Sequence, residues 1–148
     1  MKLPLAYYGD PILRKKCQPV EKFDEKLKQL VKDMEETMFA HDGIGLAAPQ
    51  VHCSLAVFIT NIPKETSEDE WEAGTTRVFI NPKIIEYSEE EWVRGEGCLS
   101  IPGVFGPVIR PMHIKVEAYD VDGNRFIEGF TELPARAIMH ENDHINGV

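Results

Sequence analysis

Two histidines near the end of the sequence stand four residues apart, in the run His140-Glu141-Asn142-Asp143-His144. On a helix such residues share a face, so both imidazoles can bind one metal ion, with Glu141 beside them as a general base. At 100° per residue, Leu133 and Ala137 fall within roughly 60° of the two histidines. The pattern predicts a metal site next to a small apolar face. Its alternative is a pair of ordinary polar positions on an amphipathic helix.

A catalytic metal site of this kind has three protein ligands and an open position for water. Metallopeptidases with this motif take the third ligand from downstream, but only four residues follow His144 here. We therefore expect the third ligand upstream, and the best-placed candidate is Cys98, in the glycine-containing run from Gly95 to Gly103. Glycines let the backbone approach a metal and a substrate closely. Cys17 and Cys53 lack such surroundings and are expected to be small buried residues.

The run Gly43-Ile44-Gly45-Leu46-Ala47-Ala48-Pro49-Gln50 is rich in glycine and alanine. It follows a predicted helix and precedes a predicted strand, the wrong order for a phosphate-binding loop, so we expect no nucleotide there. It is either a glycine turn or a segment lining the substrate, in which Gln50 would donate a hydrogen bond to a developing oxyanion. The histidines outside these runs are expected to be surface or core residues; they are His41, His52 and His113.

The rest of the pattern predicts the elements that position these residues. Apolar residues at helical spacing behind Asp24 predict an amphipathic helix that stops near 41–43, and Asp10-Pro11 can begin a short helical turn. Strands are expected at 55–59, 77–80, 84–93, 113–119 and 125–130, the last two joined by a turn at Asp122-Gly123. The acidic stretch 65–74 is expected to be a solvated loop, and a final helix begins near Thr131.

These elements predict one α+β domain over residues 1–148, with mostly antiparallel strands packed around a C-terminal metal-binding helix and an N-terminal amphipathic helix. The length of 148 residues, with 43% hydrophobic and 28% charged, suits one core.

A net charge of −9 with scattered basic residues disfavours direct nucleic-acid binding. No apolar run approaches the roughly 20 residues of a membrane helix, and the start lacks a signal-peptide stretch, so we expect a cytoplasmic protein with no membrane association. Three widely spaced cysteines predict no disulfide framework.

Three runs, Gly43 to Gln50, Glu96 to Ser100 and His140 to His144, resemble the three motifs of peptide deformylases in order and spacing, and the resemblance extends to Tyr8–Arg14. It implies that the metal ligands are Cys98, His140 and His144. It implies that Glu141 is the general acid/base and that Gln50 forms the oxyanion hole with the backbone N–H of Leu99. It further implies substrate contacts at Gly45 and Gly97, a methionine pocket lined by Ile44, Leu133 and Ala137, and a pairing of Glu96 with Arg110.

The implied activity is hydrolysis of the N-formyl group from formyl-methionine of nascent proteins, with release of formate. A metal would activate water while Glu141 takes its proton. One thiolate and two imidazoles suit Fe(II), Zn(II), Co(II) or Ni(II), and the resemblance favours iron in the cell. Nascent formyl-Met peptides are the expected partners. The resemblance also implies a transient contact with the ribosome. This sequence ends at Val148 and does not include the longer C-terminal helix of familiar bacterial members.

Two other functions fit parts of the pattern. A metallopeptidase that cuts internal bonds would also use His-Glu-x-x-His, but lacks its downstream ligand here. A small domain with a structural metal would need a fourth protein ligand that closes the site. Release of formate distinguishes the deformylase from both.

Overall fold

The computed structural model describes residues 3–6, 11–14, 16–41, 43–62, 64–67, 70–72, 75–89, 91–98 and 101–147; at 14, 64–67, 70–72, 91–98 and 101–110 only the backbone is described. The helices are η1 (Pro11–Arg14), α1 (Glu25–Ala40), η2 (Ala48–Val51) and α2 (Glu132–Ile145). The strands are β1 (Gly45–Ala47), β2 (Val57–Thr60), β3 (Lys64–Ser67), β4 (Glu70–Glu72), β5 (Arg77–Tyr87), β6 (Glu91–Cys98), β7 (Ile101–Pro111), β8 (His113–Tyr119) and β9 (Arg125–Thr131). In the described part of the chain, no helix combines the length and apolar character needed to cross a membrane.

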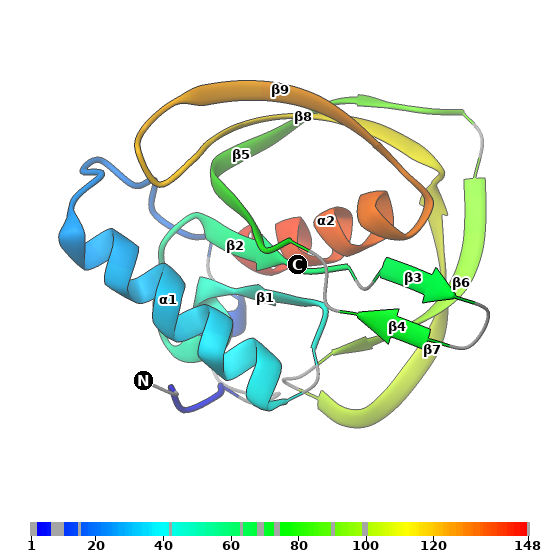
Figure 1. Cartoon of the computed structure of the whole chain (residues 1–148), viewed down its shortest axis with the longest axis horizontal. Coiled ribbons are helices and arrows are strands. Elements are labelled where there is room, and N and C mark those ends of the chain that lie inside the picture. The colour runs from blue at the N-terminus through cyan, green and yellow to red at the C-terminus, as the bar shows by residue number, and fades with distance from the viewer. Residues whose placement is uncertain are drawn as a thin grey trace.

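The largest sheet has five strands in the order β1-β2-β5-β8-β9, and every neighbouring pair is antiparallel. Gly45 of β1 lies opposite Thr60 of β2, which in turn lies opposite Arg77 of β5. The sheet curves around α2, with β8 and β9 passing over the helix in Figure 1. The predicted α+β class, with antiparallel strands around a C-terminal helix, is confirmed.

Strand β2 is buried along its whole length because a helix covers each face of the sheet there. Successive side chains of a strand point to opposite faces. Val57 and Ile59 belong to the cluster that contains Met34 and Met38 of α1, whereas Phe58 belongs to the cluster that α2 completes. In Figure 1, β1 and β2 accordingly lie between the two helices.

The predicted bounds of the first helix are confirmed, and capping explains them. Leu27 N–H donates to Asp24 Oδ1 over 3.1 Å, which satisfies one of the N–H groups that the first turn leaves without a helical partner. The helix ends at Ala40, where the N–H of His41 turns back to the Met38 carbonyl oxygen.

Backbone contacts from distant segments hold both ends of α2. At its start, Glu132 N–H donates to the Met112 carbonyl oxygen over 2.9 Å, and Glu132 has a φ of 55°, a left-handed conformation that is strained for a non-glycine residue. At its end, Cys17 N–H donates to the Ile145 carbonyl oxygen over 2.8 Å. The helix that carries the histidine pair is therefore tied to the sheet and to the N-terminal segment.

The sequence pattern misplaced the strands around Asn81. The expected strands at 77–80 and 84–93 are instead one strand, β5, which ends at Tyr87. Its register shifts between Ile80 and Lys83, and Asn81 takes a φ of 51°. The Asn81 side chain compensates by accepting from Val20 N–H over 2.7 Å and donating to the Val20 carbonyl oxygen over 2.9 Å. The Asn81-Pro82 pair therefore forms a bulge inside a continuous strand. Strand β2 also starts two residues later than expected, at Val57.

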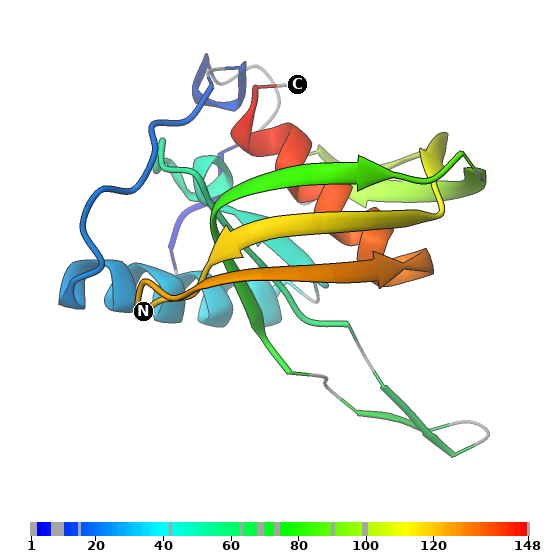
Figure 2. The same ribbon diagram turned by 90° about the horizontal axis from the view of Figure 1, so that it is seen from above.

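Outside the five-stranded sheet, the described residues form two further strand pairs. The expected acidic loop 65–74 overlaps β3 and contains β4, which pair antiparallel with Glu65 opposite Trp71. That prediction was wrong because a two-stranded ribbon need not present one face to a core, so the sequence shows no apolar alternation. Figure 2 shows this hairpin projecting from the rest of the molecule. The second pair is β6 with β7, and β7 was missed because its sequence contains prolines.

Candidate active site

His140 and His144 turn their rings toward one another from successive turns of α2. Their Nε2 atoms are 3.3 Å apart, and the ring planes stand at 79°. Two nitrogen ligands at about 2.0–2.1 Å from a tetrahedral metal ion are separated by roughly 3.3 Å. Both side chains are half-buried. This donor pair fits a divalent metal, as the spacing of the two histidines predicted.

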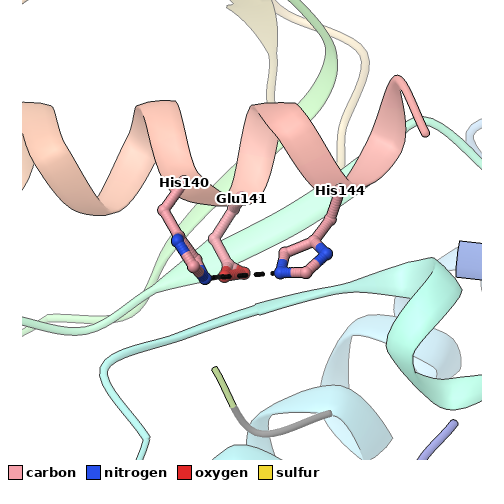
Figure 3. A group of neighbouring side chains, drawn as sticks. All are labelled: His140, Glu141 and His144. Carbon is pink, nitrogen blue, oxygen red and sulfur yellow. Dashed lines mark hydrogen bonds and ion pairs between the residues drawn. The ribbon is translucent and has the colours of Figure 1, made fainter. Parts of the chain in front are cut away.

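The carboxylate of Glu141 lies beside the histidine pair (Figure 3). The residue is only 3% exposed, and its Oε1 lies 3.9 Å from His140 Nε2. The ligand atoms of His140, Glu141 and His144 all lie within 4.8 Å of one another, and they form the one group of potential metal-binding residues within the described part of the chain. A carboxylate at this distance can exchange a proton with a water molecule bound beside the histidine pair.

Gly45, the first residue of β1, packs directly against Glu141. A Cβ atom placed on Gly45 would lie 3.1 Å from Cγ and 3.2 Å from Cδ of the glutamate. The structure therefore brings the first predicted motif against the third. The carboxylate group of Glu141 occupies the space that a side chain on Gly45 would need.

Gln50 is buried in η2, where its side chain and its backbone both accept hydrogen bonds. Its side-chain oxygen accepts from Ala47 N–H over 3.0 Å, and its backbone carbonyl accepts from Ala6 N–H over 2.7 Å. Because the amide group is planar, this places the NH₂ group on the side opposite Ala47. Both β1 and η2 contact α2, so the amide is fixed on a segment next to the histidine pair.

The residues predicted to line a methionine pocket lie on these same elements. Ile44, half-buried just before β1, accepts at its carbonyl oxygen from Asn61 N–H over 2.8 Å. On α2, Leu133 is half-buried and Ala137 is buried one turn further along. Their joint contact with a substrate side chain stays a prediction.

Of the second predicted motif, only the backbone of its first three residues is described. Leu99 and Ser100 are not described, and of Gly97 and Cys98 only the backbone is described, at the end of β6. The roles of Cys98 as a ligand, Leu99 as an N–H donor and Gly97 as a substrate contact stay predictions. The predicted pairing of Glu96 with Arg110 also concerns undescribed side chains, and the register places Arg110 opposite Trp92 and Glu96 opposite Gly106.

The sequence pattern did not reveal two supports of the site. One is the hydrogen bond from Cys17 N–H to the Ile145 carbonyl oxygen, next to His144 in the last turn of α2. The other is the close approach of Gly45 to Glu141. A backbone hydrogen bond between distant segments leaves no pattern in the sequence near either residue. The glycine at position 45 was a possible signal, because a residue without a side chain can allow a close approach.

The family model described as polypeptide deformylase matches residues 2–148. The chain belongs to the peptide deformylase family. Membership makes it an enzyme, a hydrolase of protein synthesis, and the activity of this family is the metal-dependent removal of the N-formyl group from nascent chains. This decides against the metallopeptidase and the structural-metal domain that the histidine pair alone left open.

Curated and solved peptide deformylases agree with this assignment. A peptide deformylase of Clostridium botulinum is 48% identical over 140 residues, which are 95% of this chain and 88% of that protein. Peptide deformylase 1B of Arabidopsis thaliana, chloroplastic/mitochondrial, is 43% identical over 146 residues, 99% of this chain; the chain spans 52% of that longer protein. The crystal structure of a class I type b peptide deformylase from Acinetobacter baumannii bound to Met-Ala-Ser has a TM-score of 0.92 and 36% identity, and the match covers 100% of this chain and 95% of that one.

Proposed function

We propose that this peptide deformylase domain, one catalytic unit over residues 1–148, hydrolyses the formyl group of formyl-Met peptides at a metal ion bound by His140, His144 and Cys98. The observation that carries this proposal is the 3.3 Å separation of the two Nε2 atoms, beside a glutamate that is only 3% exposed. The thiolate of Cys98 would be the third protein ligand of this metal.

Each residue of the proposed site then has a defined task. The bound metal supplies Lewis-acid chemistry and lowers the pKa of a water molecule toward neutrality. Glu141 takes the proton of the attacking water and passes it to the departing amine, so that water adds across the formyl C–N bond and yields formate and a free N-terminus. The Gln50 amide, with the Leu99 backbone N–H, donates hydrogen bonds to the formyl oxygen as its negative charge grows.

The substrate is an extended peptide that begins with formyl-methionine. Strand β1 lies at the edge of the five-stranded sheet, and an edge strand can align an extended peptide through backbone groups such as those of Gly45. The related enzyme from Acinetobacter baumannii has been solved with Met-Ala-Ser bound, a peptide that also begins with methionine. In this proposal Ile44, Leu133 and Ala137 contact the methionine side chain, and Gly97 contacts the peptide backbone.

For the native metal we propose Fe(II), which the resemblance to peptide deformylases favours; one thiolate and two neutral imidazoles would also suit zinc, nickel or cobalt. Purified protein loaded in turn with Fe(II), Ni(II), Co(II) and Zn(II) is expected to release formate from formyl-Met-Ala-Ser, most rapidly with iron under anaerobic conditions. An internally formylated lysine peptide serves as the control substrate. No formate with any metal, from folded protein that binds the metal, would contradict the proposed activity.

Because the substrates emerge from ribosomes, we propose that the enzyme works in the cytoplasm and meets the ribosome transiently. Co-sedimentation with ribosomes at low and high salt tests the contact. A transient contact predicts partial sedimentation at low salt only, and no sedimentation at either salt concentration would contradict it.

A further inference from the structure

The contact between Gly45 and Glu141 leaves no room for a side chain on Gly45. A Cβ there would meet Cγ and Cδ of Glu141 at 3.1 and 3.2 Å, and the Ile59 carbonyl oxygen at 3.5 Å. Gly45 does not have a positive φ, so its backbone conformation is open to alanine. The need for glycine at this position arises from the neighbouring carboxylate group and not from the turn of the chain.

An added methyl group would displace Glu141 more readily than the strand on its other side. Ile59 lies in β2, which is paired with β1 on one edge and with β5 on the other, so its carbonyl oxygen cannot withdraw without disturbing the sheet. The glutamate side chain can rotate about its own bonds. Rotation would move its carboxylate away from its place 3.9 Å from His140 Nε2.

We propose that Gly45 is a positioning residue for Glu141: the space above its Cα atom holds the carboxylate at the distance from the histidine pair at which it can exchange a proton with water. The inference rests on the proposed role of Glu141 in the reaction. It is separate from any contact that the backbone of Gly45 makes with the substrate, because a methyl group leaves the backbone N–H and carbonyl groups in place.

The first test compares Gly45→Ala with Gly129→Ala. The control also adds a methyl group to a strand glycine, but there the new Cβ meets its nearest atom, the Ile114 carbonyl oxygen, at an ordinary 3.8 Å. For Gly45→Ala we expect full metal content, a KM for formyl-Met-Ala-Ser within about threefold of the parent, and a kcat at least about tenfold lower. Gly129→Ala should keep both constants. An increase in KM with an unchanged kcat would overturn the proposal in favour of a substrate contact alone.

The second test does not depend on turnover. Glu141→Ala removes Cγ and Cδ, the atoms that an alanine at position 45 would meet. Gly45→Ala should therefore lower the Tm of the metal-free protein by roughly 2–8 °C when Glu141 is present, and by much less in the Glu141→Ala background. Equal losses in both backgrounds would overturn the proposal. Should Gly45→Ala fail to fold, recovery of folding in the double variant would support it, and failure of both would overturn it.

These readouts separate this inference from the proposed function. Normal turnover by Glu141→Gln would refute the catalytic role of the glutamate, and with it the catalytic meaning of the contact. The double-variant comparison of Tm would still report whether the two residues are packed together as described.

Discussion

The backbone N–H of Ala47 donates to Oε1 of Gln50 over 3.0 Å, within a segment where both residues are buried. This bond determines which end of the amide faces away from the loop. In the proposed mechanism the NH₂ group, at the other end of the amide, donates to the reacting carbonyl oxygen.

Replacing Gln50 with glutamate tests this orientation. The new carboxylate would keep an oxygen to accept from Ala47 N–H but would offer no NH₂ donor in the other direction. We expect Gln50→Glu to lower kcat by about 10²–10³-fold with metal retained, the range found when one oxyanion donor is removed. Gln50→Leu, which lacks both groups, is the control for local folding. A Gln50→Glu enzyme with parental kcat would show that the NH₂ group does not stabilise the oxyanion.

Cys98 should be the cysteine on which metal binding depends. Cys98→Ala removes the thiolate and is expected to reduce metal content greatly, whereas Cys17→Ser and Cys53→Ser should bind one metal per chain. The measurement is metal per chain by elemental analysis after dialysis. Cys98→Asp is a less decisive variant, because a carboxylate can also bind zinc and could keep part of the metal content. Full occupancy in Cys98→Ala, with loss in either serine variant, would assign the ligand to another cysteine.

Glu141→Gln should separate metal binding from turnover. The change nearly preserves side-chain volume but removes the basic carboxylate, so we expect unchanged metal content and a kcat lower by roughly 10²–10⁴-fold. Formate release and metal content are measured on the same preparation, with circular dichroism to establish that it is folded. Loss of metal would instead indicate that the glutamate is a ligand or supports one.

A bulky residue at Ala137 should obstruct the methionine side chain. Ala137 is buried on α2, three residues before His140. Ala137→Phe is expected to raise KM for formyl-Met peptides more than for formyl-Gly peptides. Overpacking is also expected to cost about 1–3 kcal/mol of stability, so thermal melting is compared first. Equal changes for the two substrates would place the pocket elsewhere.

The Cys17 thiol should make stability fall at high pH. Burial raises the pKa of this thiol from 9.0 to about 11, against a smaller opposing effect of its hydrogen bond with Ser54. Below pH 9 the thiol is neutral in both states. Between pH 9 and pH 11 it ionises in the unfolded chain first, so the unfolded state binds fewer protons and stability decreases, by at most about 3 kcal/mol.

Denaturant unfolding of the parent and of Cys17→Ser at several pH values between 8 and 11 measures this effect. Serine does not ionise in this range, so the variant should lose less stability than the parent as the pH rises. Burial also raises the pKa of the Cys53 thiol, so part of the decrease should remain in the variant. Identical pH dependence in both proteins would contradict the prediction.

The sequence alone determined the parts of the molecule that depend on near neighbours. The cap at Asp24 and the apolar spacing behind it predicted α1, and the turn at Asp122-Gly123 predicted the hairpin of β8 and β9, where Gly123 has a φ of 84°. Helical periodicity also brought His140 and His144 together. In each case the cause lies within a few residues of the effect, so a linear pattern can contain it.

The tertiary structure decided what depends on residues far apart in the chain. Only the pairing of β1 with β2 shows that the predicted glycine loop contains a strand, and only the bonds between Asn81 and Val20 explain why β5 continues through Asn-Pro. The space that Gly45 leaves for Glu141 likewise exists because β1 and α2 pack together. Such contacts depend on how segments meet in three dimensions, and composition and periodicity do not carry that information.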